Sequence, residues 1–199
     1  MASLSELKSS ITFGGGLART NKFLVTLPSL GAGGLIGALG SRNMNILCRT
    51  AQIPGKQVTT HEKRIGMKFE KVAYGYAVED VTLTFMETSL MPIRNYFDTW
   101  RGLTLDETAQ TAKYKTEYQK RVIISQLAMP LPLGAFTPNL PIDVQVSTYQ
   151  IELTNAFPTS VTAIEYNNEA DGFVETTVAL SYTNYKVVPG GELSLSVNF

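Results

Sequence analysis

Alternation of apolar and polar residues with a period of two is the feature that most constrains the fold of this chain. Side chains of a β-strand point alternately to opposite faces of the sheet, so alternation predicts a strand with one buried face. The clearest alternating segments are residues 22–27, 80–85, 149–154 and 173–186. Because four such segments recur along 199 residues, the pattern predicts a mainly β protein.

The segment from Phe173 to Lys186 is the longest of these predicted strands. One of its faces carries Val174, Thr176, Val178, Leu180 and Tyr182, and the other carries Glu175, Thr177, Ala179 and Ser181. A long strand with an unpaired edge invites pairing with another chain, and closure into a ring removes such edges. We therefore expect this strand to pair edge to edge with a second copy.

Further strands are predicted at residues 44–50 and 117–128, the latter buried on both faces at Val122-Ile123-Ile124. Residues 56–76 alternate poorly and mix charges with Gly66 and Gly75, which is typical of a projecting hairpin or long loop. A type II turn is expected at Ile53-Pro54-Gly55.

The sequence predicts helices at two places. Leu90, Ile93, Phe97 and Trp100 recur at steps of three and four, which predicts one amphipathic helix over a sheet face. Ser89 is its expected cap, Pro92 suits its first turn, and Gly102 is expected to end it. Near the N-terminus, Ser3 and Glu6 have capping-box spacing before a short helix that the glycines at 14–16 would end.

These elements predict one domain: an antiparallel β sandwich or partly open barrel with one packed α-helix. We expect this domain to span residues 1–188, with a C-terminal extension at 189–199. A glycine-rich insertion at 29–42 and a proline-rich insertion at 129–147 interrupt it. No repeat is visible.

Charge and apolar content exclude several function classes. The 17 basic and 17 acidic residues cancel, whereas a protein that grips DNA usually carries a basic excess. Passage of DNA without binding stays compatible with this balance. Charged residues make up 17% of the chain, below the ~25% typical of soluble domains. Either partners cover part of the surface, or the protein has a large apolar core.

Targeting signals are absent from the sequence pattern. The longest apolar run, Leu30 to Gly40, has eleven residues, whereas a membrane-spanning helix needs ~20. No signal peptide is visible, and the single cysteine, Cys48, cannot form an intrachain disulfide. We therefore expect a soluble protein that is made in a cytoplasm.

Residues that could carry catalysis are few and scattered. His61 is the one histidine and sits among polar neighbours, and Cys48 has the pattern of a small buried side chain. The carboxylate pairs Glu79-Asp80 and Asp106-Glu107, with Glu169 and Asp171, fit solvated turns. No zinc spacing, dinucleotide fingerprint or P-loop is present. The sequence therefore predicts no enzyme, cofactor or metal site.

Several segments, in this order, resemble the tail tube proteins of contractile-tailed bacteriophages. They are Leu17 to Val25, Cys48 with Ile53-Pro54-Gly55, Glu79 to Phe85, Arg94 to Trp100, Tyr118 to Val122, Phe157-Pro158-Thr159-Ser160-Val161 and Val178 to Tyr182. Each match is short, but together they cover roughly two thirds of the chain.

This resemblance implies a structural virion protein that forms stacked hexameric rings of the inner tail tube. Sheets of neighbouring subunits would join into one barrel around a channel for DNA ejection. The implied partners are further copies of the chain, the tail sheath protein, and baseplate and tape-measure proteins, with DNA passing transiently. The implied location is the virion tail, after assembly in the host cytoplasm.

Two sets of residues are candidates for roles in such a tube. A lumen should avoid positive charge, because cations would hold passing DNA, so Thr82, Thr84, Glu175 and Thr177 are candidate channel walls or ordinary solvent-facing positions. Lys63, Arg64, Lys68 and Lys71 are candidate contacts between rings, or else a solvated hairpin.

Two alternatives stay open at the level of the sequence. A baseplate tube initiator or a secretion-system tube protein would share the same architecture. A monomeric β-sandwich binding module belongs to another class, and it usually exposes aromatic residues, whereas the lone Trp100 lies on the apolar helical stripe.

Overall fold

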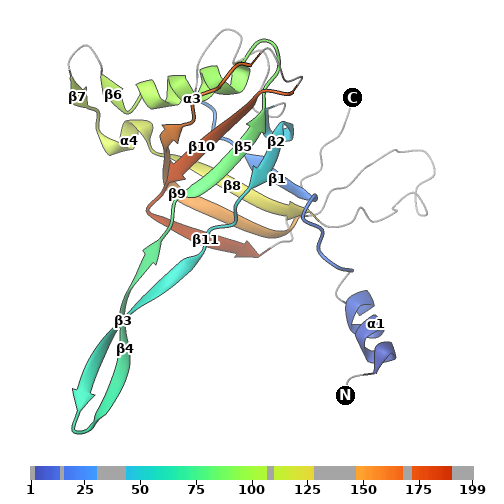
Figure 1. Ribbon diagram of the computed structural model, residues 1–199, viewed down its shortest axis with the longest axis vertical. Helices are drawn as coiled ribbons and strands as arrows, with labels where there is room; N and C mark the ends of the chain where they lie inside the picture. Colours follow the sequence, from blue (N-terminus) through green and yellow to red (C-terminus); the bar gives the residue numbers. More distant parts are fainter. Residues whose placement is uncertain are drawn as a thin grey trace.

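The computed structural model describes residues 3–13, 16–30, 44–106, 110–127, 147–167 and 172–189. Its elements in chain order are α1 (Leu4–Phe13), β1 (Phe23–Thr26), β2 (Cys48–Ala51), β3 (Lys56–Ile65), β4 (Lys68–Val78), β5 (Val81–Met86), α3 (Pro92–Gly102), β6 (Leu105–Asp106), β7 (Thr111–Ala112), α4 (Lys115–Tyr118), β8 (Lys120–Leu127), β9 (Ser147–Val161), β10 (Glu175–Ser181) and β11 (Asn184–Pro189). The predicted mainly β class with a flanking helix is confirmed (Figure 1).

Two antiparallel sheets share the long strand β9 and face each other as a sandwich (Figure 1). The first half of β9 pairs with β8 and β11, and β8 also pairs with β1. The second half pairs with β10, followed by β5 and β2. Between the halves, Asn155 has a φ of 58°, a left-handed conformation that asparagine tolerates well. This bend lets one strand serve both sheets.

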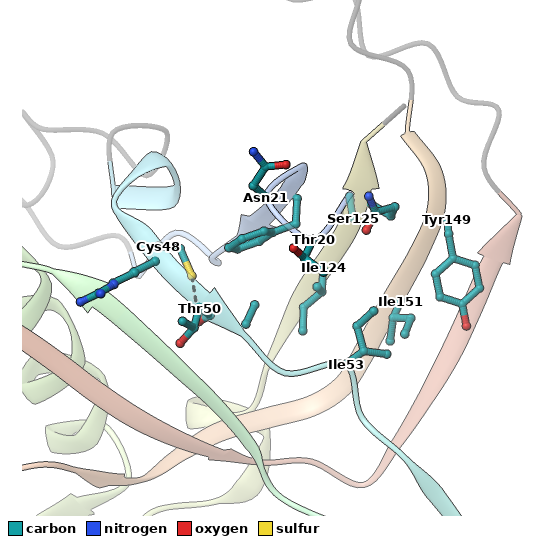
Figure 2. Close-up of a pocket in the computed structure, with 13 residues that line it drawn as sticks. Thr20, Asn21, Cys48, Thr50, Ile53, Ile124, Ser125, Tyr149 and Ile151 are labelled. Carbon is teal, nitrogen blue, oxygen red and sulfur yellow. Dashed lines mark hydrogen bonds between the residues drawn. The ribbon is translucent and has the colours of Figure 1, made fainter. Parts of the chain in front are cut away.

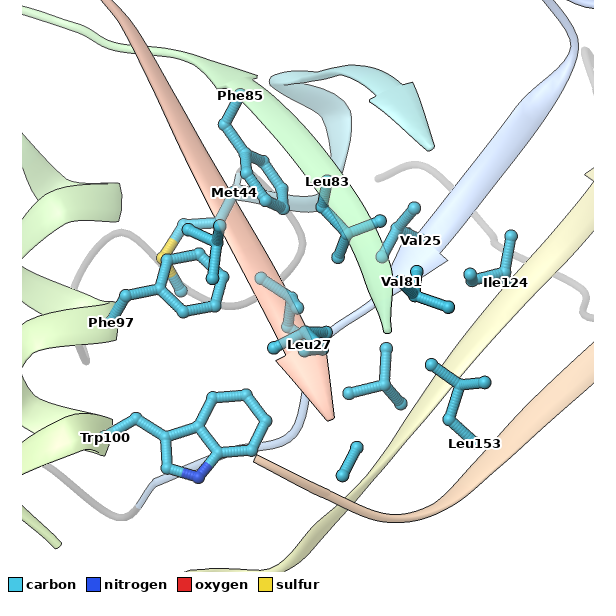
Figure 3. Packing of buried hydrophobic residues seen from close by; sticks show 14 of the residues in the cluster. Val25, Leu27, Met44, Val81, Leu83, Phe85, Phe97, Trp100, Ile124 and Leu153 are labelled. Carbon is cyan, nitrogen blue, oxygen red and sulfur yellow. The ribbon is translucent and has the colours of Figure 1, made fainter. Parts of the chain in front are cut away.

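The core lies between the two sheets and under α3 (Figure 3). The alternating residues that the sequence placed on one face supply it, for example Leu83 and Phe85 of β5 and Val178 and Leu180 of β10. Helix α3 adds an aromatic cluster in which Phe97 and Trp100 stack with ring centroids 6.2 Å apart. Burial of each such side chain contributes roughly 1.5–3 kcal/mol, so this cluster is a main source of stability.

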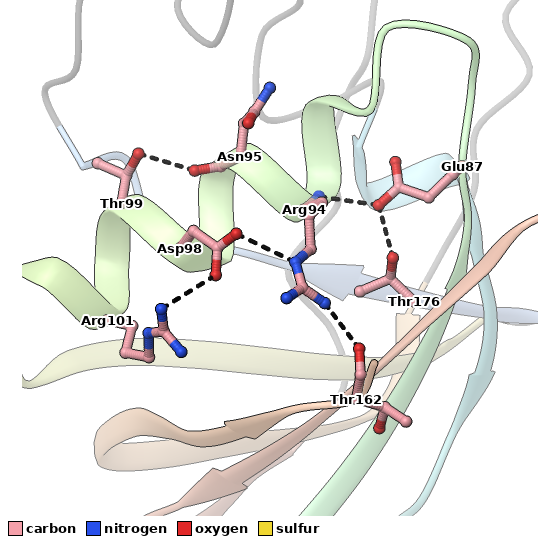
Figure 4. A network of polar contacts seen from close by, with 8 residues as sticks. All are labelled: Glu87, Arg94, Asn95, Asp98, Thr99, Arg101, Thr162 and Thr176. Carbon is pink, nitrogen blue, oxygen red and sulfur yellow. Dashed lines mark hydrogen bonds and ion pairs between the residues drawn. The ribbon is translucent and has the colours of Figure 1, made fainter. Parts of the chain in front are cut away.

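Polar contacts fix α3 to the second sheet (Figure 4). The Glu87 Oε1 atom accepts hydrogen bonds from the backbone N–H of Arg94, at 2.8 Å, and from the Thr176 hydroxyl, at 2.7 Å. The Arg94 guanidinium donates to Asp98, at 3.0 Å, and to the carbonyl of Thr162 after β9, at 2.7 Å. The helix start is thus tied to β10 and to the segment that follows β9.

The predicted helix is confirmed, but its start is later than expected. Residue Met91, in a left-handed conformation, occupies the cap position, so the prediction of Ser89 as cap is wrong. Leu90 lies before the helix with an exposed side chain, whereas Tyr96, absent from the predicted stripe, is buried. The hydroxyl of Tyr96 donates to the Pro28 carbonyl at 2.5 Å, which explains how a polar tip is accommodated there.

The prediction of one continuous strand from Phe173 to Lys186 is wrong, and a free edge is found only in its last part, at residues 184–186. The segment breaks at Tyr182 and Thr183 into β10 and β11, opposite the left-handed Asn155 at the bend of β9, and the two parts pair with the two halves of β9. Strand β10 is paired on both sides, with β9 and β5. Within the sandwich, β1, β2 and β11 each have an unpaired edge, and the longest described strand is β9, with 15 residues.

Smaller predictions have mixed outcomes. The capping box is confirmed, since Ser3 N–H donates to Glu6 at 2.7 Å and Glu6 N–H donates to Ser3 at 3.3 Å. Residues 44–46 form a helical turn before β2, so the strand predicted at 44–50 is too long. Gly55 lacks the positive φ that a type II turn requires, and the chain continues through it toward β3.

Most of the predicted insertions at 29–42 and 129–147, and the extension beyond Pro189, lie outside the described residues. Within the described residues, no helix is long and apolar enough to cross a membrane.

Candidate assembly surfaces

The hairpin of β3 and β4 projects from the sandwich as a two-stranded ribbon (Figure 1). It continues the β2–β5 edge of the second sheet, since β3 follows β2 and β4 leads into β5. Gly66, the first of the two turn residues, has a φ of 64°, as a type II′ hairpin turn requires at that position. The predicted projecting hairpin is therefore confirmed.

Large apolar side chains are exposed along the hairpin. They are Val58, Ile65, Met67, Phe69, Val72, Tyr74 and Tyr76, of which Met67 is 96% and Phe69 is 69% exposed. Paired residues share a face, so Phe69 lies opposite Arg64 on one face and Ile65 lies opposite Lys68 on the other. A two-stranded ribbon is at best marginally stable alone, and such exposure marks an interaction surface. Both faces of the hairpin are therefore candidate contact surfaces.

The four predicted inter-ring cations all lie on this hairpin but do not form one patch. Register places Lys63 and Lys68 on one face and Arg64 and Lys71 on the other. Lys71 forms an exposed ion pair with Glu62 at 3.7 Å, and Arg64 donates to the Gly66 carbonyl at 2.9 Å. Lys63, Arg64 and Lys68 therefore carry no ion pair among the described residues, and Arg64 is held by the turn backbone.

Lys56 anchors the base of the hairpin to β11. Its ammonium donates to Asn184 at 2.9 Å and lies 4.5 Å from the centroid of the Tyr76 ring and 4.9 Å from that of Tyr185. Cation–π contacts of this kind contribute about 0.5–1 kcal/mol each at exposed sites. They couple the direction of the hairpin to the first sheet, a role that the sequence alone did not reveal.

The four predicted channel-wall residues come together on the outer face of β5 and β10. Thr84 pairs with Thr177, their hydroxyls being 3.2 Å apart, and Thr82 pairs with Ala179. Glu175 lies on the same face and forms an ion pair with Arg49 of β2. Arg49 was missed by the sequence reasoning because it sits at a register shift in β2, where alternation is interrupted.

A groove of about 620 Å³ opens at the seam where the edges of β1 and β2 approach without pairing (Figure 2). Its apolar lining includes Phe23, Ala51, Ile53, Ile124 and Ile151, and its one charged lining residue is Arg49. The Cys48 thiol also lines the groove and donates to the Thr50 carbonyl at 3.4 Å. Burial raises the pKa of this thiol to about 12, so it is a poor nucleophile near neutral pH.

The two residues weighed as catalytic candidates sit in separate places. His61 lies on the exposed hairpin opposite Val72, whereas Cys48 lies in the seam groove. In the described part of the chain, no group of three His, Cys, Asp or Glu residues could hold a metal ion. The structure therefore brings together surfaces for contact, and the described residues show no convergent set of reactive groups.

Comparison with known proteins decides the family. The sequence model of the family described as "Phage tail tube protein" matches residues 18–188. The chain belongs to this family. The tail tube protein described here is thus a structural component of a tail tube, which agrees with the resemblance read from its sequence segments.

Solved structures of contractile systems share this fold. One is the cap that terminates the anti-feeding prophage tube: TM-score 0.59, 17% identity, covering 87% of this tail tube protein and 91% of that chain. A second belongs to the anti-feeding prophage baseplate: TM-score 0.57, 13% identity, covering 87% and 96%. A third belongs to the extended sheath–tube complex of an extracellular contractile injection system: TM-score 0.53, 15% identity, covering 95% and 99%. No curated protein matches the sequence.

Proposed function

We propose that this tail tube protein forms hexameric rings that stack into the inner tube of a contractile tail and conduct DNA. The hairpin carries this proposal, because it exposes apolar side chains on both faces and needs a partner. In a family of tube proteins, that partner is a further copy of the chain. Contacts between unlike surfaces of identical subunits close into rings when the rotation permits.

Stacking of rings is assigned to the hairpin. Its strands of 10 and 11 residues reach roughly 33 Å at ~3.3 Å per residue, far enough to span a neighbouring subunit. The exposed side chains of Lys63 and Lys68 would then approach carboxylates of the next ring, while Met67 and Phe69 contribute apolar contact. Tail sheath, baseplate and tape-measure proteins are the other proposed partners, in line with the sheath–tube and baseplate assemblies that share the fold.

The face of Thr82, Thr84, Glu175 and Thr177 is proposed to line the channel. Hydroxyls and a carboxylate there offer no net positive charge to DNA phosphates, because Arg49 is paired with Glu175. Joining of sheets between subunits would then use the free edges of β2 or β11 and not β10. This keeps the shared barrel of the sequence-based prediction and moves the joining edge away from residues 175–181.

Electron microscopy of the purified protein tests the proposal directly. We expect hollow tubes of stacked six-fold rings, with the Thr84–Thr177 face toward the lumen. Discrete rings that never stack would favour a baseplate initiator or a cap. A monomer at high concentration, with neither rings nor tubes, would overturn the proposed function and favour a binding module.

Charge reversal near the hairpin turn tests the stacking contact. The double variant Lys63→Glu with Lys68→Glu, which reverses the two cations of one face, is expected to shorten tubes roughly threefold at low salt while single rings still close, because rim charges guide contact more than they hold it. Tube length in micrographs is the measurement. Lys113→Glu with Lys115→Glu, an equal charge change beside α4, is the matched control. Equal tube lengths for both double variants would argue against the hairpin as the stacking surface.

A further inference from the structure

The N-terminal helix α1 has no covered face in the structure. No residue of α1 is buried, and the helix stands apart from both sheets (Figure 1). Leu4, Leu7 and Ile11 follow each other at steps of three and four and share one face, while Ser5, Glu6 and Ser9 lie on the other. Leu4 is 69% and Leu7 is 55% exposed.

A helix of this kind needs a partner to persist. Isolated helices shorter than about 12–15 residues are marginal in water, and α1 has 10 residues. The capping box at Ser3 and Glu6 sets its start but supplies little of the missing stabilisation. An amphipathic helix gains stability chiefly by burying its apolar face, so α1 is built to dock.

The segment that follows α1 is attached to the sandwich beside the seam groove. At its end, the Gly16 N–H donates to the Ile11 carbonyl at 2.9 Å, with a φ of 96° that suits glycine. Three residues later, the Arg19 carbonyl accepts from the Gln126 side chain at 3.1 Å, beside β8. From Phe13, the last helical residue, to Arg19 the chain runs six residues, roughly 20 Å at full extension, so the helix is rooted beside Gln126 at the seam groove.

The seam groove offers a surface that matches this helix. Its floor contains Phe23, Ile124 and Ile151, and Ile53 on its rim is 53% exposed. The volume of about 620 Å³ is within the ~300–1,000 Å³ of sites that enclose a drug-sized ligand, enough for several apolar side chains. Its one charged lining residue, Arg49, is already paired with Glu175, so an apolar occupant meets no unpaired charge there.

We propose that α1 of one copy docks its Leu4–Leu7–Ile11 face into the seam groove of a neighbouring copy. The inference rests on the proposed self-assembly and extends it to a segment outside the matched family range of 18–188. A patch and a pocket at different places on identical subunits make a head-to-tail contact, which suits rings and stacked rings alike. In this arrangement α1 is an assembly arm.

Disulfide trapping between two differently labelled proteins distinguishes docking in a neighbour from folding back. In a Cys48→Ala background, one protein carries Leu7→Cys and the other carries Ile53→Cys, at a position exposed enough to react. Mixing before assembly, followed by mild oxidation, is expected to give covalent heterodimers. Ser9→Cys, on the opposite helix face, replaces Leu7→Cys in the control and is expected to give at least tenfold fewer.

The remaining outcomes overturn the inference. Cross-linking confined to single chains that carry both cysteines would place α1 in its own groove. No cross-link in either arrangement, together with normal tubes from Leu7→Asp, would show that α1 does not bind the groove.

Leu7→Asp is expected to raise the protein concentration needed for assembly roughly tenfold or more, whereas Ser9→Asp leaves it unchanged. Wild-type protein that never assembles would instead contradict the proposed function itself.

Discussion

Replacement of residues 58–76 by Asn-Gly is expected to leave a folded sandwich that forms no tube. Beyond the Lys56 contact with β11, strands β3 and β4 pair with each other, so their removal spares both sheets of the body. Gln57 and Ala77 are already paired across the ribbon, and Asn-Gly suits a two-residue turn between them. The exposed apolar surface of the hairpin, which is proposed to hold successive rings together, is lost entirely.

The fold of this variant and its assembly are measured separately. Circular dichroism and thermal unfolding should resemble those of the wild type, and sedimentation with electron microscopy should show no tubes. Replacement of residues 62–71 alone, between the paired His61 and Val72, removes the distal half and keeps the base. Loss of tubes in both variants would place the contact near the turn. Normal tubes from the full replacement would show that the hairpin is dispensable.

Trp100→Ala is expected to lower the free energy of unfolding by about 3–5 kcal/mol, a large fraction of the ~5–15 kcal/mol typical of a domain. The indole is fully buried, lies against Tyr96 and Phe97, and donates from Nε1 to the Tyr118 carbonyl at 2.8 Å. Truncation therefore leaves a cavity and an unpaired carbonyl beside α4. Urea unfolding followed by circular dichroism provides the measurement.

Control variants separate packing from hydrogen bonding at this position. Trp100→Phe keeps much of the ring volume but loses the indole donor, so a smaller loss of about 1–3 kcal/mol is expected. Tyr114→Ala removes an aromatic ring that is largely exposed and should change stability by less than about 0.5 kcal/mol. A Trp100→Ala variant as stable as wild type would mean that α3 is not a main part of the core.

The helix over residues 92–102 shows what helical spacing can and cannot predict. Steps of three and four correctly identified Ile93, Phe97 and Trp100 as buried. They failed at the start, because a left-handed Met91 and the side chain of Glu87 set the first turn. Tyr96 lies three residues after Ile93 and four before Trp100, so the same spacing was available to place it in the buried stripe. The spacing could not show the partner of its hydroxyl, the carbonyl of Pro28, which lies 68 residues away.

For the candidate assembly surfaces too, the sequence predicted some features and the structure was needed for the others. Alternation placed Thr82, Thr84, Glu175 and Thr177 on outward faces, but nothing in the two segments indicated that Thr84 and Thr177 would be neighbours. The four hairpin cations were correctly placed on a projecting element, yet register distributes them over two faces. The seam groove joins residues from four separate segments, including Phe23, Ala51 and Ile151, and no motif links them.

The sequence by itself determined which residues of the clearly alternating strands face the core. That property depends on the period of two along one extended chain, and it holds for β5 and β10 alike. Whether a strand is central or at an edge was decided by the tertiary structure alone. Residues 81–86 and 157–161 flank β10 through hydrogen bonds that span long stretches of chain. In a two-layer sandwich, central and edge strands both bury one face, so alternation could reveal the buried face of β10 but not that its edges were already taken.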